Sequence, residues 1–164
     1  MPIFSRDGVR EDVWIHLDDE SVPVAETPSA WTVPADRWLR QTSELAAAPG
    51  RRGIRLAPDT EVESLAGRLE GVDLVTVELP KFKDGRAFTQ ARLLRGRLGF
   101  RGEIRARGHV IPDQLQFLQR CGVDSVELPE DARIETWSRA MRRFQAFYQN
   151  GLSDRSAAEL RHPR

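Results

Sequence analysis

The chain has 164 residues, of which 40% are hydrophobic and 30% are charged, and this composition is typical of one globular domain with a substantial core. Its 25 basic and 25 acidic residues cancel, and no apolar run approaches the roughly 18 residues of a membrane span, so we expect no membrane partner. The single cysteine, Cys121, excludes an internal disulfide and a self-contained four-cysteine zinc or iron–sulfur site, and without a visible secretory signal we expect a cytoplasmic protein.

The first 30 residues predict an N-terminal arm or an extra β-element packed against the domain. The run "SRDG" at 5–8 is typical of a turn, and "VWIHLDDE" at 13–20 is compatible with a short strand. The proline-broken run at 21–34 is expected to be irregular. This part of the chain therefore does not share the regular pattern that follows.

Four helix–strand pairs are predicted after the arm, each from helical spacing of apolar residues followed by a short apolar run. They lie at 35–50 and 54–56, at 61–70 and 74–79, at 87–98 and 103–107, and at 111–121 and 125–128. A last amphipathic helix is predicted at 134–149, where it either packs on the sheet or forms a seam for a partner helix.

A repeated phrase explains this pattern, because "GVDLVTVELP" at 71–80 returns as "GVDSVELP" at 122–129. In each copy a glycine ends the preceding helix in a left-handed conformation, an apolar run forms a buried strand, and a proline closes that strand. Strands separated by about 20 to 30 residues are joined by helical crossovers rather than by hairpins. The repeat is thus one structural unit, used at least twice.

These units predict the α/β class, with a short parallel sheet of about four βα units and the N-terminal arm added to it. The sequence leaves open whether this sheet is an open sheet or a partial barrel. The expected organisation is an arm at 1–30, a single α/β domain at 31–150 and a flexible tail at 151–164.

The zero net charge hides an uneven distribution of charge. Residues 1–36 contain eight acids and two arginines, whereas residues 81–107 contain nine basic and two acidic residues. Of the 25 basic residues 23 are arginine, which indicates either a composition bias of the genome or a face that binds anions or an acidic partner. We expect no nucleic-acid partner, because the basic stretch has few aromatic residues and no recognition motif.

Polar segments follow the second and the third predicted strands. Ligands of parallel α/β sheets bind outside the carboxyl ends of the strands, and both segments lead into helices whose first amide groups favour an anion. The predicted residues for binding an anion or a partner are Lys81, Asp84, Gly85, Arg86, Arg107, Gly108, His109, Asp113 and Gln114.

Each of these residues also has a structural interpretation. Asp84 is typical of a turn and of a helix cap, and Asp113 suits the first turn of a helix. His109 is equally compatible with a loop hydrogen bond and with acid–base work. Arg105 and Arg107 share one face of a strand, so that face meets either solvent or acids, and Arg107 near the strand end is the better functional candidate.

Two further residues are expected to be structural. Cys121 ends a helix and is interpreted as a small buried thiol rather than a nucleophile, and His16 is interpreted as structural. The chain lacks a dinucleotide-binding glycine motif, a Walker loop and the nucleophile elbow of hydrolases. No cofactor is therefore evident in the sequence and its identity stays unknown, while we expect no metal. The catalytic residues stay undefined, with Asp84 and Asp113 as candidates.

The stretch at 80–128 resembles a bacterial family of unknown function, strongly over 74–130 and more broadly over 30–149. Members of this family are commonly labelled as oxidoreductases of sulfite reduction and tend to be encoded beside the assimilatory sulfite or nitrite reductase haemoprotein. His109 departs from the resemblance, since an acidic residue is expected there in many members. The resemblance is carried by Phe82, Asp84, Gly85 and Arg86, by the run at 91–95, by Gly108, Asp113 and Gln114, and by Arg120, Cys121 and Gly122.

The resemblance implies a role in sulfur assimilation more than a mechanism, and it leaves open whether the chain is an enzyme. The leading hypothesis is an accessory protein that docks to the reductase or its electron donor, or that handles a small sulfur oxyanion. The second is a small enzyme in which Asp84 or Asp113 transfers a proton while Arg86 holds an anion. The third is a structural subunit that binds through the helix at 137–148. The oligomeric state stays open.

Overall fold

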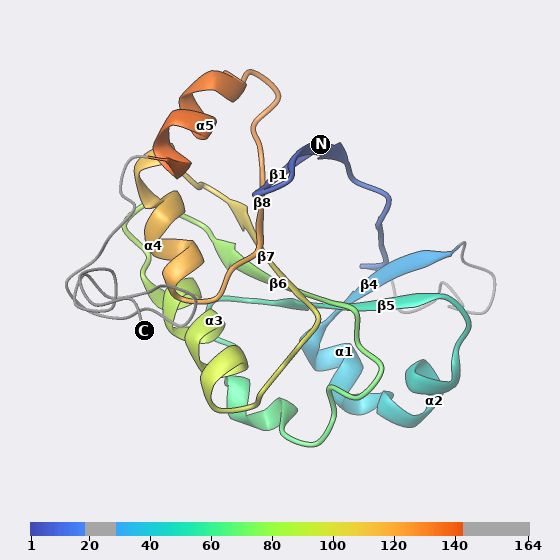
Figure 1. Ribbon diagram of the computed structural model, residues 1–164. Coiled ribbons are helices and arrows are strands. Elements are labelled where there is room, and N and C mark those ends of the chain that lie inside the picture. The colour runs from blue at the N-terminus through green and yellow to red at the C-terminus, as the bar shows by residue number, and fades with distance from the viewer. Residues whose placement is uncertain (19–28, 143–164) are drawn as a thin grey trace, which may run out of the picture.

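The computed structural model describes residues 1–18 and 29–142, and within these ranges the strands form one sheet in the order β2-β1-β8-β7-β6-β5-β4-β3 (Figure 1). The strands are β1 (Pro2–Ser5), β2 (Gly8–Glu11), β3 (Ile15–His16), β4 (Ala30–Pro34), β5 (Arg51–Leu56), β6 (Leu74–Leu79), β7 (Glu103–Gly108) and β8 (Ser125–Glu127). The helices are α1 (Ala35–Arg40), α2 (Thr42–Ala47), α3 (Arg86–Gly96), α4 (Leu115–Arg120) and α5 (Ile134–Met141), with short 3₁₀ helices η2 (Val62–Leu65) and η3 (Pro112–Gln114).

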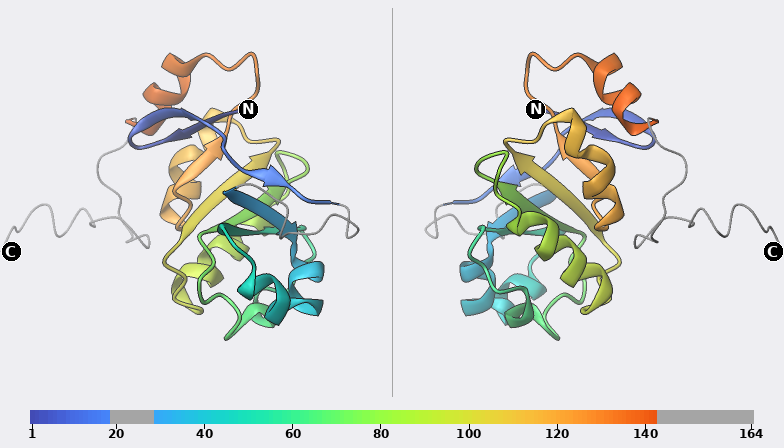
Figure 2. Two further views of the ribbon diagram at one scale, coloured as in Figure 1. Left: turned by 90° about the vertical axis from the view of Figure 1, so that its right-hand side faces the viewer. Right: turned by 90° about the vertical axis from the view of Figure 1, so that its left-hand side faces the viewer.

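The strands from β3 to β8 are parallel and lie side by side in the order in which the chain makes them. Right-handed crossovers between such strands place the connecting helices on the same face of the sheet. The sheet curls away from these helices into a half-barrel, and none of the helices in the described residues lies on its inner face (Figure 2). The predicted α/β class is confirmed, and of the two alternatives the partial barrel describes this sheet.

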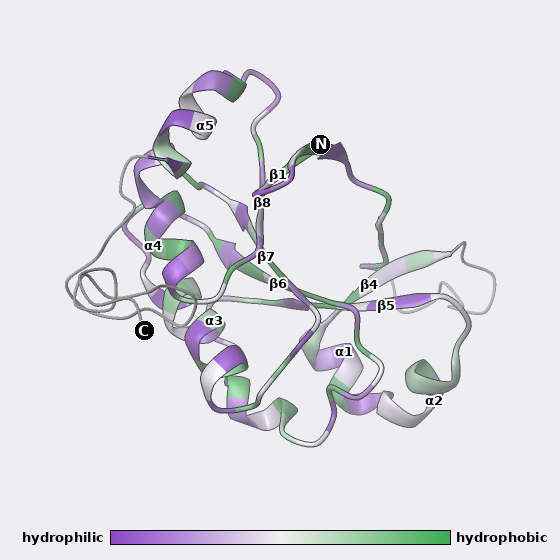
Figure 3. Cartoon of the chain, in the orientation of Figure 1, coloured by the Kyte–Doolittle hydropathy of each residue, from purple (hydrophilic) through white to green (hydrophobic). Residues whose placement is uncertain are grey.

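The outer, convex face of the sheet carries the hydrophobic core. Alternate residues of β6, such as Val75 and Val77, are fully buried and belong to one apolar cluster with Ala91 and Leu94 of α3. Full burial of a side chain such as Leu94 stabilises the fold by about 1.5–3 kcal/mol. Hydrophobic and hydrophilic residues alternate along the strands (Figure 3). The residues between those of the core therefore point to the inner, concave face.

Both copies of the repeated phrase make the same backbone contacts. Gly71 and Gly122 adopt positive φ angles of 70° and 101°, as predicted for residues that end a helical segment. Asp73 and Asp124 then each accept a hydrogen bond at a carboxylate oxygen from a backbone N–H of the neighbouring strand, β5 or β7, at 3.0 and 2.8 Å. The first half of the phrase thus ties each new strand to the preceding one.

Two local predictions were wrong. The predicted helix at 61–70 forms only the 3₁₀ turn η2, which buries Val62 and Leu65 before the chain turns at Gly67, where φ is +72°. The run at 30–34, expected to be irregular, is the paired strand β4 between β3 and β5. Its Trp31 is fully buried, so packing and strand pairing outweigh the flanking prolines.

The C-terminal helix α5 packs on the N-terminal part of the chain. Trp137 is 3% exposed, and its ring lies 6.3 Å from the ring of Phe4 on β1. This contact agrees with the packing interpretation of the last predicted helix, whose residues from 143 onward lie outside the described residues. No helix in the described ranges has the length and apolar character that crossing a bilayer would require.

The N-terminal arm joins the two edges of the half-barrel. The hairpin of β1 and β2 pairs antiparallel with β8 at one edge, whereas β3 pairs with β4 at the other edge. Residues 12–14 must therefore cross the concave face between these edges, and Trp14 forms a small apolar cluster there with Ala30 and Leu74. The predicted arm is confirmed, and it brings distant side chains onto the inner face.

Candidate functional site

The concave face of the half-barrel is lined by polar and charged side chains, in contrast to the apolar convex face. They come from five neighbouring strands, at the positions that alternate with the core residues. These concave-face residues are Thr32, Arg55, Thr76, Glu78, Glu103, Arg105, Arg107, Ser125 and Glu127.

Arg105 is the centre of a buried charge network on this face. Its side chain is 1% exposed, and its Nη1 donates to Oδ1 of Asp12 at 2.8 Å while its Nη2 donates to Oε1 of Glu103 at 3.0 Å. Glu103 also accepts hydrogen bonds from Arg10 at 2.7 Å and from the hydroxyl of Ser125 at 2.5 Å. Of the two predicted environments for this strand face, acids rather than solvent surround Arg105.

A second group joins the arm to the opposite edge of the face. The Nη1 of Arg55 donates to Oγ1 of Thr32 at 3.0 Å, and the same guanidinium pairs with Asp18. Oγ1 of Thr32 also shares a hydrogen bond of 2.7 Å with Nδ1 of His16. Burial, together with the positive charges of Arg55 and Arg107, lowers the pKa of His16, so its neutral form is favoured.

Arg107 lies next to two glutamates. It is opposite Glu78 in the register of β6 and β7, and its Nε is 3.9 Å from Oε2 of Glu127. Glu127 is 4% exposed, its burial raises its pKa, and its Oε1 has no hydrogen-bond partner among the described residues. Glu78 and Glu127 are the glutamates of the two repeated phrases, so the second half of the repeat supplies charge to the concave face.

The two predicted loops lie side by side after β6 and β7. Nε2 of Gln114 donates to the carbonyl oxygen of Phe82 at 2.7 Å, and the rings of Phe82 and His109 are 6.5 Å apart. Gly108 has a φ of +89°, and a Cβ there would lie 2.5 Å from the carbonyl oxygen of Leu79. Only glycine fits this close approach without a shift of the backbone.

Within these loops Arg86 is occupied by a local partner. Its Nε and Nη2 donate to the carboxylate of Asp84 at 2.9 and 2.6 Å, and this pairing lowers the pKa of Asp84 to about 2. Asp84 also accepts from the backbone N–H of Arg86 at 3.1 Å, which agrees with its predicted structural role at the start of α3. Arg107 lies beside Glu78 and Glu127 instead, so a shared anion site for Arg86 and Arg107 stays a prediction.

The remaining residues predicted to bind an anion or a partner lie in or beside the same two loops, which we call the predicted rim. Lys81, Gly85, Gly108, His109 and Asp113 are exposed, and Cys121, the proposed structural thiol, is buried with a pKa raised by that burial. Among the described residues of these loops, no side-chain atom is both buried and without a hydrogen-bond partner, as Oε1 of Glu127 is on the concave face. The catalytic roles proposed for Asp84 and Asp113 stay predictions.

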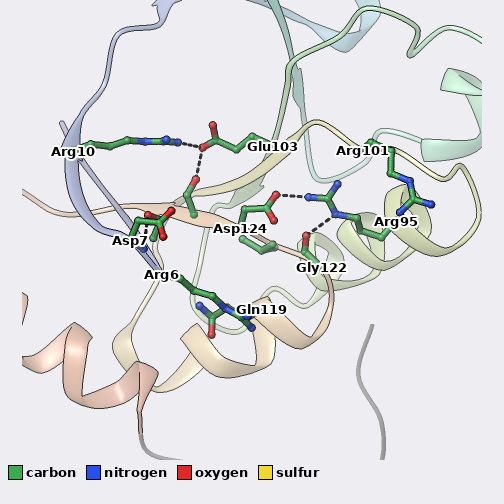
Figure 4. Close-up of a pocket in the computed structure, with 12 residues that line it drawn as sticks. Arg6, Asp7, Arg10, Arg95, Arg101, Glu103, Gln119, Gly122 and Asp124 are labelled. Carbon is green, nitrogen blue, oxygen red and sulfur yellow. Dashed lines mark hydrogen bonds and ion pairs between the residues drawn. The ribbon is translucent and has the colours of Figure 1, made fainter. Parts of the chain in front are cut away.

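A cavity of about 550 Å³ lies near the amino ends of β7 and β8, away from the predicted loops (Figure 4). We name it the arginine-lined cavity, because four arginines and three carboxylates line it. These charged residues are Arg6, Arg10, Arg95, Arg101, Asp7, Glu103 and Asp124.

The four arginines of this cavity differ in their partners. Arg95 donates to three backbone carbonyl groups at 2.7 to 3.0 Å and pairs with Asp124, and Arg10 pairs with Glu103. Arg6 and Arg101 have no hydrogen bond or ion pair with any described residue, and both are exposed. Two guanidinium groups thus remain available for a negatively charged ligand.

Neither the concave face nor this cavity was predicted from the sequence. One signal was present, because Thr76 and Glu78 alternate with valines inside an apolar strand, as inner residues of a barrel do. No local signal connects Asp12 with Arg105, which are 93 positions apart. The tertiary structure alone brings such pairs together.

Residues 53–158, well over half of the chain, match a family model described as "Bacterial protein of unknown function (DUF934)". The chain belongs to this family. The matched range begins within β5 and includes β6 to β8 with Arg95, Arg101 and Arg107, and it leaves the N-terminal arm outside. No curated protein matches the chain. The resemblance inferred from the sequence is thus confirmed at the level of a bacterial family of unknown function.

Proposed function

We propose that this protein serves assimilatory sulfite reduction by binding a small sulfur oxyanion, such as sulfite, in the arginine-lined cavity. The observation that carries the proposal is the pair of arginines, Arg6 and Arg101, that line the cavity without a carboxylate partner among the described residues (Figure 4). A guanidinium presents planar, forked N–H donors, which match the oxygens of an oxyanion.

The charge of the surroundings favours this cavity over the predicted rim. Four arginines and three carboxylates line the cavity, so its lining carries one net positive charge. At the rim, by contrast, Arg86 is held by Asp84, and Arg107 lies beside Glu78 and Glu127. An anion at either rim arginine would have to compete with a carboxylate that is already in place.

The volume and the family support the choice of ligand in different ways. A cavity of about 550 Å³ falls within the range of about 300–1,000 Å³ that is usual for small-molecule sites. The sulfur identity of the anion comes from the family resemblance, whose members are associated with sulfite reduction. The proposal concerns binding and delivery of the anion, and it assigns no redox step to this chain.

The test is a calorimetric titration of the purified chain with sulfite, sulfate and inorganic phosphate. Replacing Arg6 and Arg101 together by alanine removes two charge-assisted hydrogen-bonding groups, each of which contributes about 1.5–3 kcal/mol. We therefore expect the affinity for sulfite to fall by about 100-fold or more. The matched control is Arg97→Ala, which removes an exposed arginine that pairs with Glu63 outside the cavity and should leave the affinity unchanged.

Two outcomes would contradict the proposal. If the double variant binds sulfite as the wild type does, and Arg107→Ala or Arg86→Ala loses binding instead, the anion site is the predicted rim. If phosphate binds as tightly as sulfite, the cavity is a general anion site and the link to sulfur chemistry fails.

Docking to the reductase or its electron donor stays a prediction beside this proposal. The basic stretch at 81–107 does not provide one free basic surface for it, because Arg86, Arg95, Arg97 and Arg105 each pair with a carboxylate. A pull-down from native cell extract, analysed by mass spectrometry, tests for the haemoprotein directly. Recovery of the haemoprotein that is lost on substitution of the unpaired arginines would support docking rather than anion delivery.

A further inference from the structure

Two potential metal ligands of the N-terminal arm, Asp12 and His16, meet a third from the far end of the sheet, Glu127, on the concave face. Asp12 lies where the arm crosses this face, His16 is in β3 and Glu127 is the last residue of β8. One ligand atom of each lies within 4.8 Å of the other two. We infer that Asp12, His16 and Glu127 form a binding site for one divalent transition-metal ion.

The partners of Asp12 and His16 leave one ligand atom of each available. Oδ1 of Asp12 accepts from Arg105 and, at 3.2 Å, from the backbone N–H of Trp14, and Oδ2 lies 3.9 Å from Nε2 of His16. The other ring nitrogen of His16 is held by Thr32 at 2.7 Å. Such a hydrogen bond on the far nitrogen fixes the ring orientation, as it does for histidines that bind metals.

Glu127 supplies the independent observation that points to a ligand. Its side chain is more than nine-tenths buried, and its Oε1 has no hydrogen-bond partner among the described residues. Buried carboxylate oxygens almost always have a partner, so an orphan oxygen on a carboxylate that belongs to this cluster indicates that a bound cation completes its contacts.

The ligand set and its spacing indicate the class of metal. One imidazole and two carboxylates suit ions such as Zn²⁺, Mn²⁺ or Fe²⁺, whereas Mg²⁺ and Ca²⁺ prefer oxygen ligands alone. Bonds of about 2.0–2.2 Å in a tetrahedral arrangement place two ligand atoms of one ion about 3.3–3.6 Å apart. The ligand atoms of this cluster lie within 4.8 Å of one another, so binding requires them to move together by about 1 Å. Three protein ligands leave positions open for water or for an anionic ligand, as in catalytic metal sites.

This site goes beyond the proposed function and does not depend on it. None of its three ligands lines the arginine-lined cavity. The metal site is therefore tested in the absence of sulfite, and the anion site is tested in the presence of chelator, so that either proposal can fail alone.

The experiment is a calorimetric titration of the chelator-treated full chain with ZnCl₂ and with MnCl₂. A titration with MgCl₂ serves as the comparison, and we expect Mg²⁺ to bind weakly. Loss of the hydrogen bond that orients a metal-binding histidine usually lowers metal affinity by about 10–100-fold, so we expect about tenfold or more from Thr32→Val. We expect about 100-fold or more from the ligand variant Glu127→Gln. Metal content of one ion per chain, measured by mass spectrometry, checks the stoichiometry.

The repeated phrase offers a matched control. Glu78 is the counterpart of Glu127 on β6 and faces the same side of the sheet, but it is not part of the cluster. Glu78→Gln should therefore retain wild-type affinity, and His109→Ala should do so as well, which excludes binding at an exposed histidine. His16→Ala serves as a second ligand variant if Glu127→Gln does not fold.

The inference is overturned if the wild-type chain binds neither Zn²⁺ nor Mn²⁺. It is also overturned if the folded Glu127→Gln or His16→Ala variant binds with wild-type affinity. In that case Glu127 is only the partner of Arg107 in a structural ion pair.

Discussion

Substitution of Arg105 by methionine tests whether the buried charge network holds the N-terminal arm on the half-barrel. Methionine keeps most of the length and the apolar stem of the side chain while it removes the guanidinium. Because Arg105 is 1% exposed and contacts Asp12 and Glu103, the change leaves two carboxylates without their shared buried partner.

The structure indicates how the cost divides between the two carboxylates. Glu103 keeps its hydrogen bonds from Arg10 and Ser125, whereas Asp12 keeps only the backbone N–H of Trp14 among its described hydrogen bonds. Breaking a buried ion pair by removing one partner costs about 3–5 kcal/mol, and we expect the lower end, about 3 kcal/mol, because only Asp12 is left poorly compensated. At about 2–4 °C per kcal/mol this loss lowers the Tm by about 6–12 °C.

The measurement is urea unfolding of the wild type, Arg105→Met, Asp12→Asn and the double variant, in the presence of chelator so that bound metal does not contribute. Neutralising Asp12 in the Arg105→Met background should restore about 1–2 kcal/mol, because the uncompensated charge is then absent. A loss below about 1 kcal/mol, or strictly additive effects in the cycle, would show that the network does not hold the arm.

Three further predictions follow from the loops and the network. Gly108→Ala should lose at least about 1–2 kcal/mol in urea unfolding, since alanine is strained at a φ of +89° and its Cβ meets a carbonyl oxygen; an unchanged midpoint would contradict this. Burial raises the pKa of Glu103, but the hydrogen bond from Ser125 and the charges of nearby arginines lower it below its usual value, so its stabilisation is present above about pH 4.5 and is lost as the pH falls through the folded-state pKa. Ser125→Ala should thus cost about 1.5–3 kcal/mol at pH 7, with a gap to wild type that shrinks in acid; a pH-independent gap would refute the assignment. In an NMR titration Asp84 should have a pKa of about 2, and Arg86→Ala should raise it towards about 3.9; no rise would show that the pairing is absent in solution.

Local features of the sequence were sufficient to predict most helices and strands of the repeating units. The strand at 74–79 was predicted to the residue, because an apolar run bounded by glycine and proline leaves few other conformations. The strand at 103–108 was predicted to within one residue from its place after a glycine stop. The helix at 86–96 was predicted from about residue 87 up to a stop at Gly99, by analogy with the repeated units. The segment at 61–70 shows the limit of this approach, since its apolar spacing suits a helix while the structure packs Val62 and Leu65 from a single 3₁₀ turn.

The candidate site depended on pairings that no local pattern contains. Arg107 was predicted to bind a ligand because it lies near a strand end, and the structure places it beside Glu127. Arg86 was predicted for the same reason, but its guanidinium is paired with its neighbour Asp84. His16, interpreted as structural, lies close to Asp12 within the arm, but it reaches Glu127 only because the arm crosses from one edge of the sheet to the other.

The sequence by itself determined the βα units, the glycine stops and the two faces of each strand, because these depend on interactions between residues close in the chain. Only the tertiary structure decided that the strands stand in sequential order, that the sheet curls, and that the arm spans its inner face. Contacts such as Asp12 with Arg105 join residues whose spacing along the chain carries no periodic signal, and they form when the whole sheet closes around them.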